Sequence, residues 1–115
     1  MQIEYRVARL ADVPAIEALI PLSARTLQRA FYSTEQLDGA IGTVFGVDTQ
    51  LIRDGTYIVA LADGAVVGCG GWSRRKTPYG GDRAKKAEDP LRDPHLEPAM
   101  IRAFFVHPDF ARRGI

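Results

Sequence analysis

The chain has 115 residues, a net charge of +1, 46% hydrophobic residues and 25% charged residues. This length and composition are typical of one globular domain and exclude the disordered and fibrous classes. No apolar run approaches the roughly 18–20 residues of a membrane span, and Met1 opens onto a charged, alternating segment instead of a signal peptide. The single cysteine, Cys69, excludes an intrachain disulfide and a zinc site built from several cysteines. It suits a reducing cytoplasm, where we expect the protein to be located.

The charge is divided unevenly along the chain. Residues 1–73 carry 5 Lys or Arg against 8 Asp or Glu, a net charge of −3, whereas residues 74–115 carry 10 against 6, a net charge of +4. The second part is therefore expected to meet an anionic group.

The first elements are a strand and a helix. Residues 2–7 alternate strictly between polar and apolar types, which predicts a half-buried strand. Asp12 then stands at an N-cap position, with Pro14 in the first turn and apolar residues at helical spacing behind it. Pro21 interrupts this pattern, so we expect the helix to stop there and to resume from Ser23. The residues of the resumed helix that are expected to face the core are Leu27, Ala30 and Phe31.

A further helix is expected to begin at Ser33, which has the capping-box spacing to Gln36. Its apolar stripe consists of Leu37, Ala40, Ile41 and Val44. A short helical turn follows over residues 48–53.

The middle of the chain predicts strands. Residues 56–62 are apolar on both faces, as in a strand that is covered on both sides. Asp63-Gly64 is a two-residue hairpin signal, and residues 65–72 form the partner strand. Residues 100–106 form the last strand. Between them, residues 74–98 hold four of the seven prolines and twelve charged residues, which predicts a long loop that is mobile or functional.

The resulting element order is β-α-α-β-β-β, with a hairpin beside helices. This order predicts the α/β class with a mixed sheet. We find no internal repeat and no domain linker in the sequence.

The strongest chemical signal lies in residues 101–115, where an apolar strand runs into a proline and then into a basic turn that ends at Gly114. Because glycine accepts positive φ, backbone N–H groups of such a turn can point outward. If a helix followed, its positive end would add to the charges of Arg112 and Arg113 and form a site for an anion such as pyrophosphate. A solvated basic turn is the alternative that these residues leave open.

The segment Phe-Phe-Val-His-Pro-Asp-Phe-Ala-Arg-Arg-Gly-Ile, residues 104–115, resembles the strand-to-loop signature of the GCN5-related N-acetyltransferases (GNAT), which bind acetyl-coenzyme A (acetyl-CoA). The order of the predicted elements before this segment also agrees with that of the family. An alternating first strand is followed by residues 9–12, which lead into helices, and then by a hairpin that includes residues 68–72. The resemblance covers the whole chain, but only its last dozen residues are specific. It implies the N-terminal part of the acyl-CoA N-acyltransferase fold, with residues 1–115 as a single domain that is incomplete at its C-terminus.

In that family the loop follows the pattern Gln/Arg-x-x-Gly-x-Gly/Ala, and its N–H groups hold the pyrophosphate of the cofactor. Here Ala111 takes the first position and Gly114 that of the first glycine, and the closing Gly or Ala would be residue 116, beyond the sequence. Ala111 departs from the pattern, but a loop that works through backbone groups tolerates this change. Because the closing Gly or Ala of the loop lies beyond the sequence, we expect this chain alone to be inactive.

The resemblance further implies that acetyl-CoA is the acetyl donor and that no metal is involved. The strand residues would pair with the pantetheine and the turn residues would hold the pyrophosphate. The implied cofactor-binding residues are Phe104, Phe105, Val106, Arg112, Arg113, Gly114 and Ile115. The implied chemistry is direct attack of a deprotonated amine on the thioester carbonyl, which needs a base, an oxyanion donor and an acid. Family members often place a tyrosine acid on a later helix, which would lie beyond Ile115.

Few side chains qualify as catalytic groups. Glu97, just before the last strand, is a weak candidate for the base, and a solvated loop carboxylate is its alternative. His107 lies at the end of the strand. Its imidazole either takes part in proton transfer there or caps the strand and faces water. His95 has no metal-like partner spacing, and Cys69 is expected to be a small buried side chain.

Three functional hypotheses follow. The leading one is an N-acetyltransferase that acts on a primary amine of a small molecule or a peptide. The second is a non-catalytic GNAT-fold binding or regulatory module. The third is an anion- or nucleic-acid-binding fragment that uses residues 74–86. Acidic residues that are interleaved with the basic ones nearly cancel the positive potential of this part of the chain, so we expect no nucleic acid as partner. We expect no membrane as partner either. The sequence leaves open whether the protein forms a homodimer, and it does not distinguish one acceptor amine from another.

Overall fold

The computed structural model describes residues 2–41, 45–75, 81–82, 91, 93, 95–96 and 98–115. The predictions that concern Val44 and Glu97, and those on most of residues 76–97, lie outside the described residues. None of the helices in these ranges combines the length and the apolar character that crossing a bilayer requires.

A four-stranded antiparallel sheet forms the centre of the molecule, with strand order β1-β2-β3-β4. Its strands are β1 (Ile3–Val7), β2 (Tyr57–Ala62), β3 (Ala65–Ser73) and β4 (Met100–Val106). The predicted hairpin is confirmed: β2 and β3 are joined by Asp63 and Gly64, whose φ angles of +49° and +84° are those of a tight two-residue turn. The α/β class is confirmed, and every pairing among the described strands is antiparallel.

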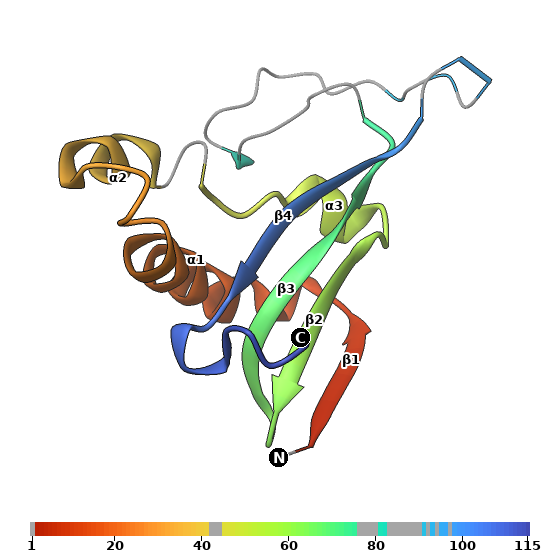
Figure 1. Cartoon of the computed structure of the whole chain (residues 1–115). Coiled ribbons are helices and arrows are strands. Elements are labelled where there is room, and N and C mark those ends of the chain that lie inside the picture. The colour runs from red at the N-terminus through yellow and green to blue at the C-terminus, as the bar shows by residue number, and fades with distance from the viewer. Residues whose placement is uncertain are drawn as a thin grey trace.

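The helices lie on one face of this sheet, which we call the helix face (Figure 1). They are the short 3-10 helix η1 (Leu10–Asp12), α1 (Val13–Leu27), α2 (Thr34–Ala40) and α3 (Thr49–Arg53). The main core lies between α1, α3 and the sheet, because β-strand side chains alternate between the two faces. Its buried residues are Ala8, Ile16, Leu19, Ile20, Leu51, Ile52, Tyr57, Val59 and Cys69.

The helix α1 contradicts the prediction that Pro21 interrupts it. The helix runs unbroken through Pro21 to Leu27, although proline supplies no N–H to the helical ladder. Ile20 and Ala24, on either side of the proline, are fully buried in the core, and this packing holds the helix together across the missing bond. Consequently Phe31 lies in the turn after the helix and is 79% exposed, where the sequence predicts a core position.

The starts of the short helices agree with the sequence, but α2 ends at Ala40, so Ile41 lies beyond the helix in which its apolar stripe was predicted. The Ser33 side chain accepts a hydrogen bond from the N–H of Gln36, and the Gln36 side chain accepts one from the N–H of Ser33, so the predicted capping box is confirmed. The Asp48 carboxylate caps α3 by accepting from the N–H of Gln50 at 3.0 Å. Leu37 is buried as predicted.

The second face of the sheet, which we call the open face, carries exposed apolar side chains. Figure 1 shows the C-terminal segment running in front of this face, opposite α1 and α3. Phe110 and Ile115 of that segment pack against Ala60, Ala62 and Val67. The rest of the face keeps large apolar groups in solvent, including Tyr5, Val7, Ile58, Trp72 and Phe104. The apolar side of β1 lies on this face, where only Ile3 is partly buried, so the prediction of a half-buried β1 holds only at its start. The prediction that β2 is covered on both sides is wrong at Ile58, which is 42% exposed.

Candidate functional site

The strand β4 carries a β-bulge in its middle. Arg102 stands opposite Gly71 and Phe105 opposite Cys69, so Ala103 and Phe104 share the single partner Gly70. Ala103 has a φ of +58°, an unusual conformation for a residue with a side chain. Bulges of this kind bend a strand and redirect its groups, and they are common next to active sites.

Buried polar groups hold the bulge from the helix face. The Tyr57 hydroxyl donates a hydrogen bond of 2.7 Å to the carbonyl of Ala103 and lies 3.1 Å from the sulfur of Cys69. Burial, together with the neighbouring Cys69, raises the pKa of Tyr57. Arg102 donates to the Asp48 carboxylate at 3.1 Å, with both side chains buried. The bulge is thus fixed by contacts from β2, β3 and the start of α3.

Cys69 is buried, as predicted from the sequence. Burial raises the pKa of its thiol above the ordinary value, so the reactive thiolate form is disfavoured. The structure therefore supports a packing role for Cys69 and gives no support to nucleophilic chemistry at this thiol.

The outer edge of β4 has no strand beside it among the described strands. Successive N–H groups of an antiparallel strand point alternately to its two edges. The N–H of His107 bonds to the Val67 carbonyl in β3, so the N–H of Val106 points to the outer edge, where it donates to the Ser23 hydroxyl at 3.3 Å. Phe104, at the bulge, is 63% exposed. The outer edge of the predicted cofactor strand thus has no described strand beside it, and at Val106 its N–H is bonded to Ser23.

The turn after β4 begins with the 3-10 helix η3 (Pro108–Phe110). Nδ1 of His107 accepts a hydrogen bond from the N–H of Asp109 at 3.1 Å, so His107 caps this short helix. The guanidinium carbon of Arg113 lies 5.8 Å from the centre of the Phe110 ring, within the range of a cation–π contact. Phe110 therefore ties the basic turn to the open face.

The turn takes positive φ at two positions. Gly114 has a φ of +79°, as expected for the glycine of this turn, and Arg112 has a φ of +60°. A non-glycine residue in this region costs roughly 1 kcal/mol and is a reason to look for a functional role. Arg112 and Arg113 are both exposed, so their charges are available to an anion.

An apolar cavity of about 340 Å³ lies on the open face beside the bulge. Phe104 and Val106 line one side of it, Ile115 another, and Gly68 and Gly70 form its floor in β3. The floor is glycine because a Cβ at Gly70 would run into the Phe104 ring. The cavity adjoins the predicted pantetheine strand at Phe104 and Val106 and the end of the predicted turn at Ile115, but Arg112 and Arg113 do not line it. No sequence prediction placed a cavity here, although three glycines within β3 signal a close approach of neighbouring groups.

The other candidate residues lie away from this place or outside the described residues. His95 is exposed, and its N–H donates to the carboxylate of Asp93. Arg75, in the segment considered for nucleic acid, pairs with Asp54 at 2.7 Å, and this contact lowers the pKa of Asp54. Glu97 lies outside the described residues. No cluster of three or more metal-binding side chains occurs within the ranges that the structure describes.

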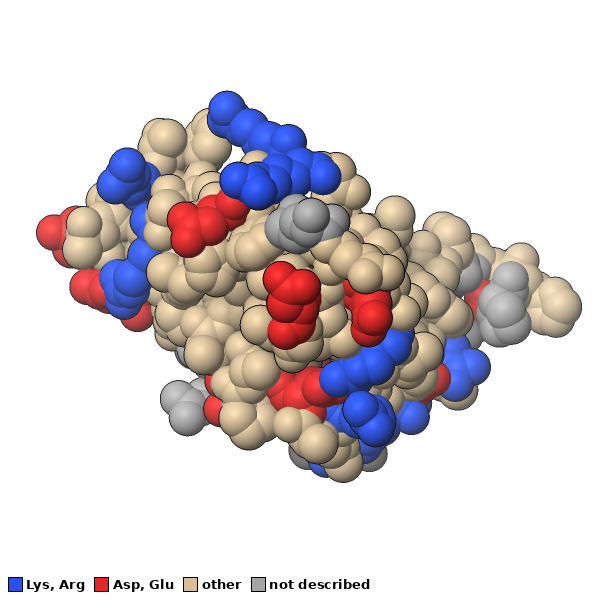
Figure 2. All heavy atoms as spheres, turned by 90° about the horizontal axis from the view of Figure 1, so that it is seen from below, with Lys and Arg blue, Asp and Glu red and all other residues tan. Residues whose placement is uncertain are grey.

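The described charges are mixed in sign on the surface seen in Figure 2. Basic and acidic groups alternate across that face, and neither sign covers it continuously. Among the described residues, this face therefore carries no broad surface of one charge.

The structure is similar to solved acetyltransferase structures. Over all of this chain it matches the PaiA N-acetyltransferase from Thermoplasma acidophilum in complex with coenzyme A, with a TM-score of 0.64 and 13% sequence identity. A GNAT family acetyltransferase from Brucella melitensis in complex with acetyl-CoA gives a TM-score of 0.49 and 19% identity over 99% of the chain. The chain spans 65% of the first of these proteins and 60% of the second.

Neither a protein-family model nor a curated protein matches the sequence. At 13% identity the similarity to the PaiA enzyme is one of fold. The described chain therefore has the fold of an N-acetyltransferase, as its resemblance to the GCN5-related N-acetyltransferases implies.

Proposed function

We propose that the full-length protein is an acetyl-CoA-dependent N-acetyltransferase. The observation that carries the proposal is the geometry of residues 103–115: a bulged strand with an accessible edge leads directly into a basic turn with positive φ. The fold supports it, because the similar PaiA protein is an N-acetyltransferase in complex with coenzyme A.

The residues present fit such a donor. A pantetheine chain carries amide groups, which can pair with backbone groups on the outer edge of β4 near Phe104, where no described strand lies beside it. A pyrophosphate is a compact anion, which suits the guanidinium groups of Arg112 and Arg113 and the N–H groups of a turn containing Gly114. The same turn is fastened to the sheet through Phe110 and Ile115, so it is held in place before any ligand binds.

The bound donor would supply a thioester carbonyl as the electrophile. In the transfer, the lone pair of a neutral amine forms the C–N bond while the C–S bond breaks, the amine loses one proton, and the coenzyme A thiolate gains one. Glu97 as the base stays a prediction, as do the nature of the amine and the cytoplasmic location.

The proposal is tested by calorimetric titration of acetyl-CoA into the full-length protein, combined with an acetyl-transfer assay on a panel of amines. The double variant Arg112→Ala, Arg113→Ala is expected to bind acetyl-CoA about tenfold more weakly, because two exposed charge contacts of up to about 1 kcal/mol each are lost. Arg29→Ala removes an exposed arginine from the turn after α1 and serves as the matched control, with unchanged affinity expected.

The outcomes separate the hypotheses. Equal affinity of the double variant and the control would contradict the assigned pyrophosphate site, and failure of the unmodified protein to bind acetyl-CoA would contradict the proposal as a whole. Binding without transfer to any amine would favour the non-catalytic binding or regulatory module.

A further inference from the structure

The histidine at the end of β4 is a titratable side chain to which the proposed transfer gives no role. His107 directly follows Val106 and precedes η3, and its side chain is 30% exposed. Its backbone N–H donates to the carbonyl of Val67 in β3 at 2.8 Å, which fixes this residue to the sheet. His107 therefore lies between the strand and the turn that are proposed to hold the acetyl donor.

The imidazole of His107 caps η3 through a nitrogen that must be free of a proton. Nδ1 accepts the hydrogen bond from the N–H of Asp109, and a nitrogen that accepts carries no hydrogen. In the protonated imidazole both nitrogens are donors, so Nδ1 can no longer accept from this N–H. The carboxylate of Asp109 lies 3.9 Å from the same nitrogen and can pair with the new N–H. Protonation thus exchanges a backbone cap for an ion pair.

One aromatic ring connects this cap to the arginines of the turn. The ring of His107 packs edge-on against the ring of Phe110, with 5.7 Å between their centres. The guanidinium carbon of Arg113 lies 5.8 Å from the centre of the same Phe110 ring. A rotation of the imidazole that releases the cap therefore also changes the contact that holds Phe110, and with it the support of Arg113.

Other elements face His107 across a cavity of about 480 Å³. The charged residues that line this cavity are Arg6 from β1 and Asp12 from η1, and they bond to each other through both carboxylate oxygens at 2.7 Å. Because these two groups satisfy each other, Asp109 is the carboxylate left to a protonated His107. The residues that α1 contributes to the lining are uncharged, namely Ala15, Ala18, Leu19 and Leu22.

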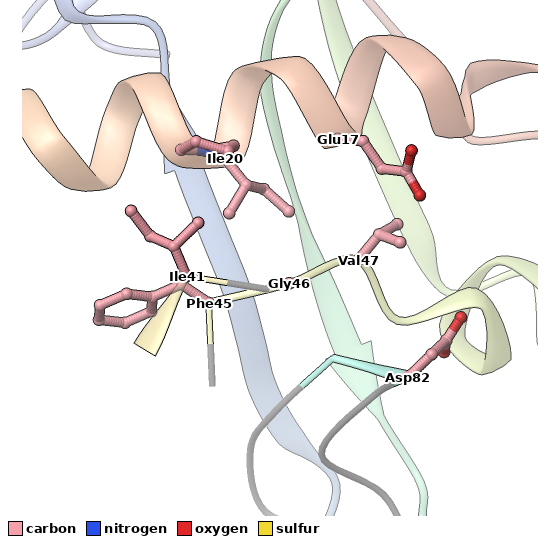
Figure 3. Close-up of a pocket in the computed structure, with 8 residues that line it drawn as sticks. Glu17, Ile20, Ile41, Phe45, Gly46, Val47 and Asp82 are labelled. Carbon is pink, nitrogen blue, oxygen red and sulfur yellow. The ribbon is translucent and has the colours of Figure 1, made fainter. Parts of the chain in front are cut away.

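A different cavity on the helix side, of about 280 Å³, has no part in this arrangement. Figure 3 shows the carboxylates of Glu17 and Asp82 there, beside Val47. Neither of these two acidic residues lines the cavity at His107, and neither belongs to the turn. Glu17 thus offers a control position, a carboxylate on α1 that can be changed without touching His107 or the donor turn.

From these contacts we infer that His107 is a positioning residue for the acetyl donor, and that it acts only in its neutral form. Its role toward the donor rests on the proposed function. The neutral imidazole keeps η3 capped and Arg112 and Arg113 in the described arrangement. The protonated imidazole releases the cap, so the turn must be ordered again when an anion binds, and binding weakens. Since imidazole is the side chain that ordinarily changes its charge between about pH 8 and pH 5, donor binding weakens over this range as the pH falls.

An NMR pH titration of the full-length protein without ligand tests the release of the cap. We expect the amide signals of Asp109, Phe110 and Arg113 to shift with the same midpoint as the ring signals of His107. The variant His107→Asn keeps an acceptor at this position, because asparagine is a preferred N-cap residue, but its side chain does not titrate. In this variant the three amide signals should no longer follow such a midpoint. Amide signals that stay in place while His107 of the unmodified protein titrates would overturn the inference.

Calorimetric titration of acetyl-CoA at about pH 8 and about pH 5.5 tests the role toward the donor. A phosphate monoester of the ligand also titrates near pH 6, so the deciding quantity is the ratio of the Kd values of the unmodified protein and His107→Asn at each pH. We expect equal affinities at the higher pH and about fivefold weaker binding by the unmodified protein at the lower pH, as for the loss of one cap. Glu17→Gln is the control and should match the unmodified protein at both pH values.

The outcomes separate this inference from the proposed function. The same pH dependence in His107→Asn and in the unmodified protein would overturn the inference. Tighter binding by the unmodified protein than by His107→Asn at the lower pH would overturn it as well, since this would mean that the added positive charge attracts the anion more than the lost cap weakens its binding. A protein whose cap opens as expected but that binds no acetyl-CoA at either pH would contradict the proposed function while supporting the pH-sensitive cap.

Discussion

Gly71 in β3 lies where a side chain has no room. A Cβ built on Gly71 would collide with the backbone carbonyl of Thr56, which cannot move without disturbing the start of β2. Gly39 in α2, by contrast, has nothing within 4 Å of the position of its Cβ. The two glycines therefore serve different purposes, one for close approach of two strands and the other without a steric requirement.

We expect Gly71→Ala to lower the free energy of unfolding by at least about 2 kcal/mol, because overpacking against backbone cannot relax through a side chain. Gly39→Ala is expected to raise it by about 0.5–1 kcal/mol, since alanine has the higher helix propensity. Urea unfolding of the two variants measures both values. A similar effect of both substitutions would contradict the packing described for β3.

The pKa of the Asp12 carboxyl group lies well below its ordinary value. The Arg6 guanidinium bonds to both of its oxygens at 2.7 Å, the N–H of Arg9 donates to it as well, and the pKa falls from 3.8 to about 2. Because the pKa in the folded state is below that of the unfolded chain, the unfolded chain binds the proton first as the pH falls. The stabilisation is thus present above about pH 4 and lost as the pH approaches 2.

Asp12→Asn should therefore be less stable than the unmodified chain at pH 7, with the difference narrowing between pH 4 and pH 2. Urea unfolding at a series of pH values measures it. Asp38→Asn, in an exposed pair with Arg25, is the control and should change the free energy of unfolding by less than about 1 kcal/mol. A difference for Asp12→Asn that does not depend on pH would argue against this ion pair.

At the level of elements, β4 depends on groups that are far from it in sequence. The Ala103 carbonyl at its bulge is bonded by the Tyr57 hydroxyl from β2, and Tyr57 is only 1% exposed. Removal of one partner leaves a buried acceptor unsatisfied, which costs about 1–3 kcal/mol.

Tyr57→Phe keeps the packing of the ring and removes only this bond, so we expect the free energy of unfolding to fall by about 1–3 kcal/mol. Acetyl-CoA affinity should fall with it, because the bulge shapes the accessible edge of β4. Tyr32→Phe, at an exposed position after α1, should change neither quantity measurably. Equal behaviour of the two variants would show that the hydroxyl does not hold the bulge.

The elements themselves could largely be predicted from the sequence. Alternation in β1, the Asp63-Gly64 turn and the Ser33 capping box are local signals, and the structure confirms each. The course of α1 through Pro21 could not be predicted, since it depends on the burial of Ile20 and Ala24 against a sheet formed by later residues. The bulge in β4 is equally non-local.

The candidate site also has one part that the sequence can indicate and one part that it cannot. The strand and turn of residues 104–115 are contiguous, so the sequence can indicate a candidate anion site there, with a solvated basic turn as the alternative. The cavity on the open face could not be predicted, because its lining comes from all four strands and from Ile115, which only the fold brings together.

On the scale of the whole molecule, the two faces of the sheet have different roles. The open face carries the apolar cavity at Phe104, and the basic turn is fastened to this face through Phe110 and Ile115. The helix face carries the main core, against which Phe105 of β4 packs. The candidate donor site on the open face therefore rests on a strand that is packed into the core from the helix face.

The central claim is that β4 and the following turn bind acetyl-CoA, and a ¹⁵N NMR titration of the full-length protein with acetyl-CoA tests it most directly. We predict that the amide signals of residues 104–106 and 111–115 shift in a saturable manner, while those of α2, which borders neither part of this site, stay in place. Saturating acetyl-CoA that leaves the signals of residues 104–106 and 111–115 unchanged would contradict the account.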